Sequence, residues 1–422
     1  MDREIFVYVD TAHKPAPVGR LWTRSRKGQE SASFEYDRRW LANPDAFPLE
    51  PSMTLGPGPH HTLSGRALFG ALGDSAPDRW GRVLMRRSER RAVERDKRTP
   101  RTLTETDFLL MVDDETRMGA LRFAETECGP FHETTAATRI PPFLELPKLL
   151  SAAERFGAEK DTAEDIRLLL APGSSLGGAR PKASVRDRDG TLAIAKFPQK
   201  TDEFSAVAWE SVALTLAAKA GIDTPRWRVE PVAKKQVLLL TRFDRGESAR
   251  RIPFLSAMSM LGASDREPRS YMEIADAIRR YGAEPLADLA QLWRRIVFNI
   301  LISNTDDHLR NHAFLFAGTQ GWRLSPAYDM NPVPPEIKPR VLSTFIDLED
   351  GSASLDLALG VAGYFKLPLL QARAVAADVA RATTRWRTAA AKAGIKAAEI
   401  DRMAPAFEHR DLTNARKRAL TA

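Results

Sequence analysis

The hydrophobic pattern of the first 140 residues predicts a small unit of mixed strands and helices. Segments 5–9, 18–22 and 33–36 are rich in β-branched and aromatic residues and are expected to be strands. A helix at 105–112 and a further strand at 119–123 complete the unit.

A long helix is predicted within this unit, capped by Asp78 or Ser75 and continuing to about Asp96. It is crowded with arginine: Arg79, Arg82, Arg86, Arg87, Arg90, Arg91 and Arg95. Two interpretations remain open for these side chains. They form either a solvated helix face or a surface for phosphate or an acidic partner.

A polar, threonine-rich stretch from Glu125 to Pro142 has little periodicity and is expected to contain a domain boundary. The elements predicted beyond it alternate between helix and strand: helices 143–156 and 163–170, strands 183–185 and 191–197, helix 203–219, and strands 227–230 and 236–240.

The remainder of the chain is expected to be mainly helical. Apolar residues at helical spacing predict helices at 270–280, 286–301 and 369–393, with an irregular stretch at 330–335. A length of 422 residues suits two or three domains. We therefore predict an α+β protein with three parts: 1–140, 141–245 and 246–422.

Composition narrows the class of protein. Apolar residues make up 43% and charged residues 28%, as in an ordinary globular protein, and no apolar run has membrane-spanning length. The start of the chain does not resemble a signal peptide. One cysteine, Cys128, excludes a disulfide framework and a thiolate metal cage, so we expect a cytoplasmic protein without a membrane partner. A net charge of +8 favours an anionic partner such as a nucleotide or nucleic acid.

The polar residues after segment 286–301 have the spacing of a protein-kinase catalytic loop. Four residues separate Asp306 from Asn311. In kinases, this aspartate takes the proton of the substrate hydroxyl and this asparagine holds a metal ion. Asp329 follows a short predicted strand, 322–324, where a second magnesium-binding carboxylate is expected. Because Mg²⁺ uses few protein ligands besides the phosphates, Asn311 and Asp329 would suffice.

A glycine-bearing loop upstream is a candidate for phosphate binding. Gly177 and Gly178 allow backbone N–H groups to approach phosphate closely, and Ala179 and Lys182 follow them. The loop lacks the spacing of a Walker loop or a dinucleotide fingerprint. Taken alone, it is more typical of a hairpin turn.

The next segments supply further kinase-type residues. The apolar strand that ends near Lys196 resembles a Val-Ala-Ile-Lys strand, so Lys196 is expected to bind the nucleotide phosphates. Glu210, in the following helix, is its expected ion-pair partner. The segment from Thr241 to Arg245 is predicted to be the hinge, where the backbone around Thr241 and Phe243 meets adenine.

Taken together, these segments resemble the HipA-type toxin kinases. The resemblance covers nearly the whole chain and depends on several runs of residues: 175–182, 242–245, 305–311 and 325–329 for the kinase, with 77–82 and 119–123 for a small N-terminal domain.

The resemblance implies a two-lobed protein-kinase-like fold, with a mixed N-lobe and a mostly helical C-lobe, preceded by a small α/β N-terminal domain. It implies a serine/threonine-protein kinase that uses ATP and Mg²⁺ and is the toxin of a bacterial toxin–antitoxin pair. The expected substrate is a translation protein such as an aminoacyl-tRNA synthetase. A HipB-like helix-turn-helix antitoxin would bind the toxin and bring it to DNA.

The resemblance also assigns roles to individual residues. Asp306 corresponds to the catalytic base, Asn311 and Asp329 to the magnesium ligands, and Lys196 to the phosphate-binding lysine. Ser175 falls on a serine that some members autophosphorylate, and Ser174 beside it is an alternative. Thr241 stands where some relatives have glutamate, so contacts from the backbone to adenine are expected to persist.

Three other interpretations are considered. A metallohydrolase would use Asp306, Asp307, His308 and His312, but these histidines would need further ligands. We instead expect His308 to brace the catalytic loop beside the nucleotide. A small-molecule kinase would have the same catalytic residues, and an inactive kinase-fold protein would act as a corepressor that binds DNA with a helix-turn-helix partner.

Overall fold

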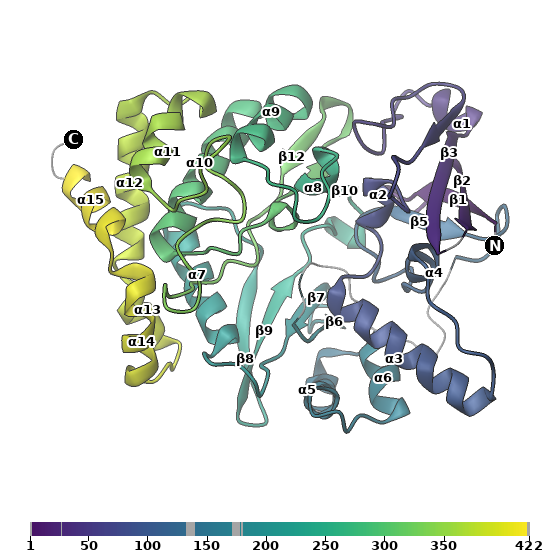
Figure 1. Cartoon of the computed structure of the whole chain (residues 1–422), viewed down its shortest axis with the longest axis horizontal. Helices are drawn as coiled ribbons and strands as arrows, with labels where there is room; N and C mark the ends of the chain where they lie inside the picture. Colours follow the sequence, from purple (N-terminus) through teal and green to yellow (C-terminus); the bar gives the residue numbers. More distant parts are fainter. Residues whose placement is uncertain (1, 27, 132–139, 171–177, 179, 420–422) are drawn as a thin grey trace. The chain divides into compact units, whose positions relative to one another are not determined.

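The computed structural model describes residues 2–26, 28–131, 140–170, 178 and 180–419. The chain forms two compact units, the first made by residues 1–200 with 230–255 and the second by 201–229 with 256–422 (Figure 1). Within the described ranges, no helix combines the length and hydropathy needed to cross a membrane. The division into three domains stays a prediction.

The first unit begins with an antiparallel sheet in the order β4-β3-β2-β1-β5. Its strands are β1 Arg3–Val9, β2 Ala16–Arg26, β3 Gln29–Tyr36, β4 Pro59–His61 and β5 Leu121–Ala124. The predicted strands in this region are confirmed. Gly19 of β2 is required for close packing, because a Cβ atom there would lie 2.3 Å from the carbonyl oxygen of Glu35.

The arginine-rich helix α3 spans Arg79–Asp96. The structure decides between the two possible caps, since a side-chain oxygen of Asp78 accepts a hydrogen bond from the backbone N–H of Gly81 at 2.9 Å. Three shorter helices accompany it: α1 Arg38–Leu41, α2 Gly70–Gly73 and α4 Glu105–Leu110.

A second sheet has the order β6-β7-β9-β8. Its elements and the preceding helices are α5 Leu146–Gly157, α6 Ala163–Leu170, β6 Lys182–Arg186, β7 Leu192–Lys196, β8 Trp227–Val232 and β9 Lys235–Thr241. Val185 and Leu239 pack with Leu149 in one apolar core, which also includes Trp80 and Leu84 of α3. Helix α3 therefore shares a core with this sheet.

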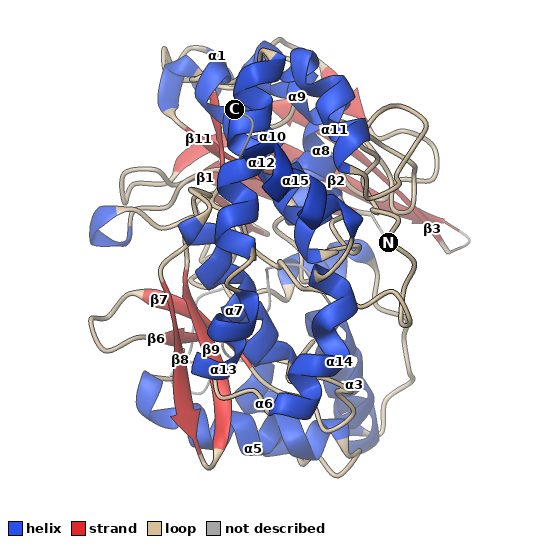
Figure 2. Cartoon of the chain, turned by 90° about the vertical axis from the view of Figure 1, so that its left-hand side faces the viewer, coloured by secondary structure: helices blue, strands red, loops and turns tan. Residues whose placement is uncertain are grey.

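The second unit is mainly helical (Figure 2). Its helices are α7 Ala206–Lys219, α8 Ala257–Met260, α9 Tyr271–Tyr281, α10 Pro285–Ile302, α11 Leu355–Val361, α12 Leu369–Thr383, α13 Trp386–Lys392, α14 Ala397–Phe407 and α15 Arg410–Ala419. Helix α10 is buried along most of its length and contacts α9, α11, α12, α14 and α15. A helix that is buried along most of its length and touches five other helices lies at the centre of a helical core.

Short elements complete the chain. They are the strands β10 Phe254–Ser256, β11 Ala313–Phe316 and β12 Trp322–Leu324, and the 3-10 helices η1 Phe143–Glu145, η2 Glu247–Ala249, η3 Leu309–Asn311, η4 Gly318–Gln320 and η5 Ala362–Phe365. Strands β11 and β12 pair in antiparallel fashion immediately before the segment that carries Asp329.

The predicted α+β class is confirmed, but one predicted helix is wrong. Segment 369–393 is two helices, α12 and α13, separated by Thr384 and Arg385. The break allows Trp386 to stack on Phe407 of α14, with ring centroids 4.6 Å apart and an interplanar angle of 2°. Packing between rings distant in sequence therefore overrides the local helical pattern.

Candidate active site

The candidate catalytic loop starts where α10 ends. Ser303 has a left-handed backbone (φ 52°), which terminates the helix as a glycine often does. Asn304 and Thr305 are fully buried. The side chain of Asn304 donates to Asn299 Oδ1 at 3.0 Å and accepts from the backbone N–H of Asn331 at 3.3 Å. The loop is thus fixed to α10 and to the chain just after Asp329.

The adjacent carboxylates Asp306 and Asp307 have opposite environments. Asp307 is buried; one of its oxygens accepts from the hydroxyl of Tyr271 and lies 2.6 Å from Nε2 of His312. Burial favours a raised pKa for Asp307, but His312 and Tyr271 outweigh it and lower that pKa. Asp306 leaves 71% of its side chain exposed. Asp307 therefore holds the loop, and Asp306 is open to a substrate.

Lys338 is the cation beside the open carboxylate. Its Nζ donates to the carbonyl oxygen of Thr305 at 3.0 Å and lies 3.4 Å from Oδ1 of Asp306. Two neighbours hold the same stretch of chain along the loop: the Ser343 hydroxyl donates to the Thr305 carbonyl, and the Thr344 hydroxyl donates to the Asp307 carbonyl.

Asn311 has the properties of a cation ligand. Its side chain is buried, and its Nδ2 donates to the Asp306 carbonyl at 3.1 Å. Its Oδ1 is buried and has no hydrogen-bond partner among the described residues. An unsatisfied buried carbonyl oxygen is costly, and oxygen is the ligand that Mg²⁺ prefers. The Asn311 side chain therefore fits the metal-binding role expected for it.

Asp329 and His308 lie in segments tied to this loop. Asp329 is half-buried and has a left-handed backbone (φ 56°). The hydroxyl of the preceding Tyr328 donates to the Arg310 carbonyl at 2.7 Å, which connects the segment of Asp329 to the loop. His308 is half-buried, and its Nδ1 has no hydrogen-bond partner among the described residues.

Metal ligation by a cluster of protein side chains has no support in the described part of the chain. No three His, Cys, Asp or Glu side chains there come close enough to hold a metal ion together. A magnesium site of Asn311 and Asp329 is of a different kind, because nucleotide phosphates and water would supply its other oxygens.

Lys182 and Lys196 stand directly opposite each other on the antiparallel strands β6 and β7. Like charges at such positions repel. The structure relieves the repulsion through Asp78, whose Oδ2 lies 2.8 Å from the Nζ of buried Lys182. Lys196 is half-buried. A role for either lysine in ATP binding stays a prediction, but Lys182 has a structural partner that sequence reasoning missed.

Part of the predicted phosphate loop lies outside the described residues, namely Ser174, Ser175, Gly177 and Ala179. Gly178 is described, and its φ of 104° lies in the region that favours glycine.

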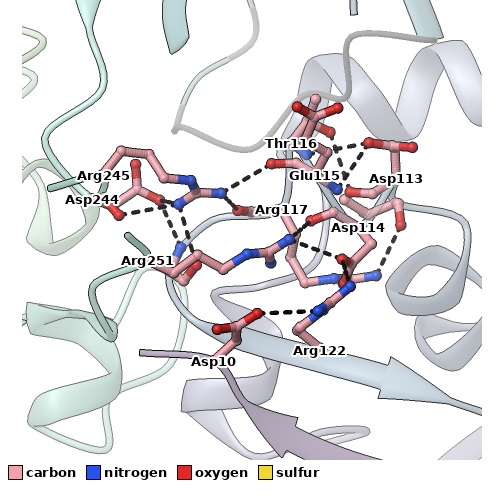
Figure 3. A network of polar contacts seen from close by, with 12 residues as sticks. Asp10, Asp113, Asp114, Glu115, Thr116, Arg117, Arg122, Asp244, Arg245 and Arg251 are labelled. Carbon is pink, nitrogen blue, oxygen red and sulfur yellow. Dashed lines mark hydrogen bonds and ion pairs between the residues drawn. The ribbon is translucent and has the colours of Figure 1, made fainter. Parts of the chain in front are cut away.

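Two charged residues of the predicted hinge, Asp244 and Arg245, point toward the N-terminal part of the first unit, where Glu115 and Arg117 lie (Figure 3). Arg242 and Asp244 are fully buried, and Arg242 Nε donates to Asp244 Oδ1 at 2.8 Å. Asp244 Oδ2 also accepts from the backbone N–H of Gly119 at 2.8 Å. Arg245 donates to the carbonyls of Glu115 and Arg117 at 3.0 and 2.8 Å.

These contacts belong to a larger arginine–aspartate network, which we define as Asp10, Asp114, Arg117, Arg122, Arg242, Asp244, Arg245 and Arg251. Burial favours a raised pKa for Asp244, but the charges of Arg242 and Arg245 outweigh it and lower that pKa to about 2. Thr241 and Phe243 alternate with these buried charges along the chain, and their contacts to adenine stay a prediction.

Several arginines of α3 contact other residues of the first unit, which neither a solvated helix face nor a phosphate-binding surface predicts. Arg82 pairs with Glu105, and Arg91 pairs with Asp161 at 2.9 Å. Arg86 lies over the ring of Phe108 at 5.1 Å. Several of these side chains therefore stabilise the first unit itself.

Glu210 is buried on α7 in the second unit, whereas Lys196 belongs to the first. Their ion pair stays a prediction.

Comparison with known proteins establishes the family. The family model described as "HipA N-terminal domain" matches residues 9–124. The family model described as "HipA-like C-terminal domain" matches residues 174–408. These matches include β2–β5 with α3, and the catalytic loop with Asp329. The mixed α+β fold and the kinase-type loop define a HipA-like, kinase-related protein. The chain belongs to the HipA family.

Two curated relatives carry kinase names. A Haemophilus influenzae protein named "Putative kinase" is 27% identical over 213 residues, which are 43% of this chain and 61% of that protein. A Sinorhizobium fredii protein named "Putative kinase Y4mE" is 25% identical over 342 residues, which are 74% of each chain.

The fold is also similar to a solved structure of the Shewanella oneidensis toxin–antitoxin system, described as HipA, HipB and its operator DNA complex. The TM-score is 0.67 at 16% identity, with 99% of this chain and 97% of that chain covered. At this identity the likeness shows the fold.

Proposed function

We propose that this protein is an ATP- and Mg²⁺-dependent serine/threonine-protein kinase. The observation that carries the proposal is the contrast between Asp306 and Asp307, in which the loop carboxylate at the kinase-type position is open and its neighbour is locked by Tyr271 and His312. The kinase names of the relatives support the same activity.

The proposed reaction assigns a task to each residue. Asp306 takes the proton from a substrate hydroxyl, whose oxygen forms a bond to the γ-phosphorus as the bond to the β–γ bridging oxygen breaks and ADP leaves. Asn311 and Asp329 would hold magnesium, which neutralises phosphate charge when bound. Lys196, Lys182 and the glycine loop would contact the phosphates, Glu210 would pair with Lys196, and the backbone at Thr241 and Phe243 would meet adenine. His308 would brace the loop.

We further propose that the kinase is the toxin of a bacterial toxin–antitoxin pair. Membership of the HipA family and the fold shared with the Shewanella protein support this role. A HipB-like helix-turn-helix antitoxin would be its partner and would mediate any contact with DNA. Its substrate would be a translation protein such as an aminoacyl-tRNA synthetase, and Ser175 or Ser174 would be its self-phosphorylation site.

The test uses ³²P-labelled ATP with Mg²⁺ and a lysate, followed by mass spectrometry of the labelled proteins. Asp306→Asn should reduce transfer by about 10²–10⁴-fold, the range for loss of a general base. Its melting temperature should match that of the wild type because the side chain is exposed. Expression of the wild type, but not of Asp306→Asn, should stop growth.

The matched control is Asp265→Asn, which alters an exposed carboxylate that pairs with Arg310 of the same loop. It should retain transfer. Wild-type transfer by Asp306→Asn would remove the kinase assignment. Label that appears only on small molecules would favour the small-molecule kinase instead.

A further inference from the structure

Lys338 lies outside the kinase-type spacing of Asp306 and Asn311, and its position gives it a separate role. Its Nζ is 3.4 Å from Asp306 Oδ1, and its side chain is 40% exposed. The other cation of the loop, Arg310, is turned to Asp265. Among the cations placed by described contacts, Lys338 is therefore the one directed at the proposed base.

The distances required for phosphoryl transfer indicate that Lys338 lies near the reacting phosphorus. A general base must lie about 2.6–3.2 Å from the hydroxyl oxygen whose proton it takes. That oxygen must approach the phosphorus to about 3–3.5 Å. A cation that already touches the carboxylate is therefore within a short side-chain movement of the transferred group, and lysine has a flexible four-carbon stem.

The segment that carries Lys338 is held firmly. Arg340, two residues further on, donates to the Ile300 carbonyl at 3.0 Å and to the Ser303 hydroxyl at 3.1 Å, both at the end of α10. Arg340 also pairs with Asp411 of α15 at 2.8 Å. The backbone is thus anchored on both α10 and α15, while the end of the Lys338 side chain remains accessible.

Charge chemistry indicates what Lys338 does. In phosphoryl transfer, negative charge spreads over the three equatorial oxygens of the transferred group. A preorganised cation at that position stabilises the transition state. Building on the kinase function proposed above, we propose that Lys338 contacts the γ-phosphoryl group during transfer and stabilises the charge that develops on it.

The primary experiment compares wild type, Lys338→Met and Lys338→Arg in phosphoryl transfer. Lys338→Met should lower kcat by about 10²-fold, a typical loss for one transition-state donor. The KM for ATP should change by less than about 3-fold, because the contact is made mainly in the transition state. Lys338→Arg should recover most of kcat, since it keeps the charge. Lys392→Met, at an exposed lysine of α13, is the matched control and should behave as wild type.

A binding experiment separates contact with the phosphoryl group from mere positioning of Asp306. ADP with aluminium fluoride and Mg²⁺ mimics the transferring group, whereas ADP alone lacks it. Calorimetry should show that Lys338→Met binds the aluminium fluoride complex at least about tenfold more weakly and binds ADP unchanged. The same loss should occur in an Asp306→Asn background, because the contact is independent of the base.

Unchanged affinity for the aluminium fluoride complex would overturn the proposal, and so would loss of the effect in the Asp306→Asn background. A rise in transfer by Lys338→Met would also overturn it and would show that the lysine masks Asp306. These results assume a wild type that transfers phosphate. A wild type without transfer to any substrate contradicts the proposed function itself.

Discussion

The arginine–aspartate network and the catalytic loop use the same chemical groups in opposite ways. Asp244 is fully buried, and its partners are two arginines and the N–H of Gly119. Asp306 is largely exposed, and its one described side-chain contact is with Lys338 at 3.4 Å. A buried charge with many partners specifies structure, whereas an exposed charge on a rigid loop remains available for chemistry.

The largest effect on stability is expected for Asp244→Asn, which tests whether the buried aspartate specifies structure. The change leaves Arg242 and Arg245 buried without their counter-charge, so the first unit should lose about 3–5 kcal/mol of unfolding free energy. Urea denaturation would measure the loss. Asp306→Asn should change the same quantity by less than about 0.5 kcal/mol, as expected for exposed positions. Equal effects of the two variants would refute the distinction between them.

The next largest effect is expected at the buried pair of Asp78 and Lys182. Asp78→Ser keeps a capping oxygen for α3 but removes the counter-charge of Lys182, so we expect a loss of about 3 kcal/mol. Lys182→Met should also destabilise the unit. The double variant should lose clearly less than the sum of the two single variants, because each single variant strands one charge. Strict additivity in a double-mutant cycle would mean that the pair contributes no coupling.

The smallest effect is expected in the pH dependence of stability, and it comes from His409 in the second unit. Burial and the nearby charge of Arg340 lower the pKa of His409 to about 4, against the opposing effect of Asp411. The neutral form is therefore favoured in the folded protein. Its contribution is complete above the ordinary pKa of about 6.5 and is lost as the pH falls towards 4. By pH 5 the loss should be on the order of 1–2 kcal/mol.

Denaturation of wild type and His409→Gln at pH 7.5 and pH 5 would measure this term. Glutamine does not titrate, so the variant should lose less stability between these two pH values than the wild type does. An identical pH dependence in both proteins would assign the effect to other groups.

Local patterns predicted much of the fold because they depend on neighbouring residues. Helix α10, expected at 286–301, spans Pro285–Ile302, since its apolar residues recur at helical spacing. The local sequence likewise limits the N-terminal cap of α3 to Ser75 or Asp78, and the structure shows Asp78. The position of Asp306 after a buried helix was also predictable, but its exposure beside a locked Asp307 was not.

Contacts between distant residues explain what the sequence did not reveal. Lys182 follows a glycine loop and is predicted to bind the nucleotide, and its ion pair with Asp78, which lies 104 residues earlier, has no signal in the local sequence. Arg242 and Asp244 belong to the predicted nucleotide hinge, and the local sequence gives no sign that their carbonyl and amide partners are at 116–119. In 241–244, the charged residues alternate with Thr241 and Phe243, and this pattern indicates that the two sets of side chains point in different directions. No comparable signal marked Lys338.

The anchoring of Arg340 has a practical consequence for shortening the protein. The match to the HipA-like C-terminal domain ends at residue 408, but Asp411 pairs with Arg340 and accepts from the backbone N–H of Leu355 at 2.9 Å. A chain cut at the family boundary would leave the half-buried guanidinium of Arg340, two residues from Lys338, without its counter-charge. A shortened protein should therefore keep α15, because contacts made by Asp411 lie beyond the residues recognised by similarity.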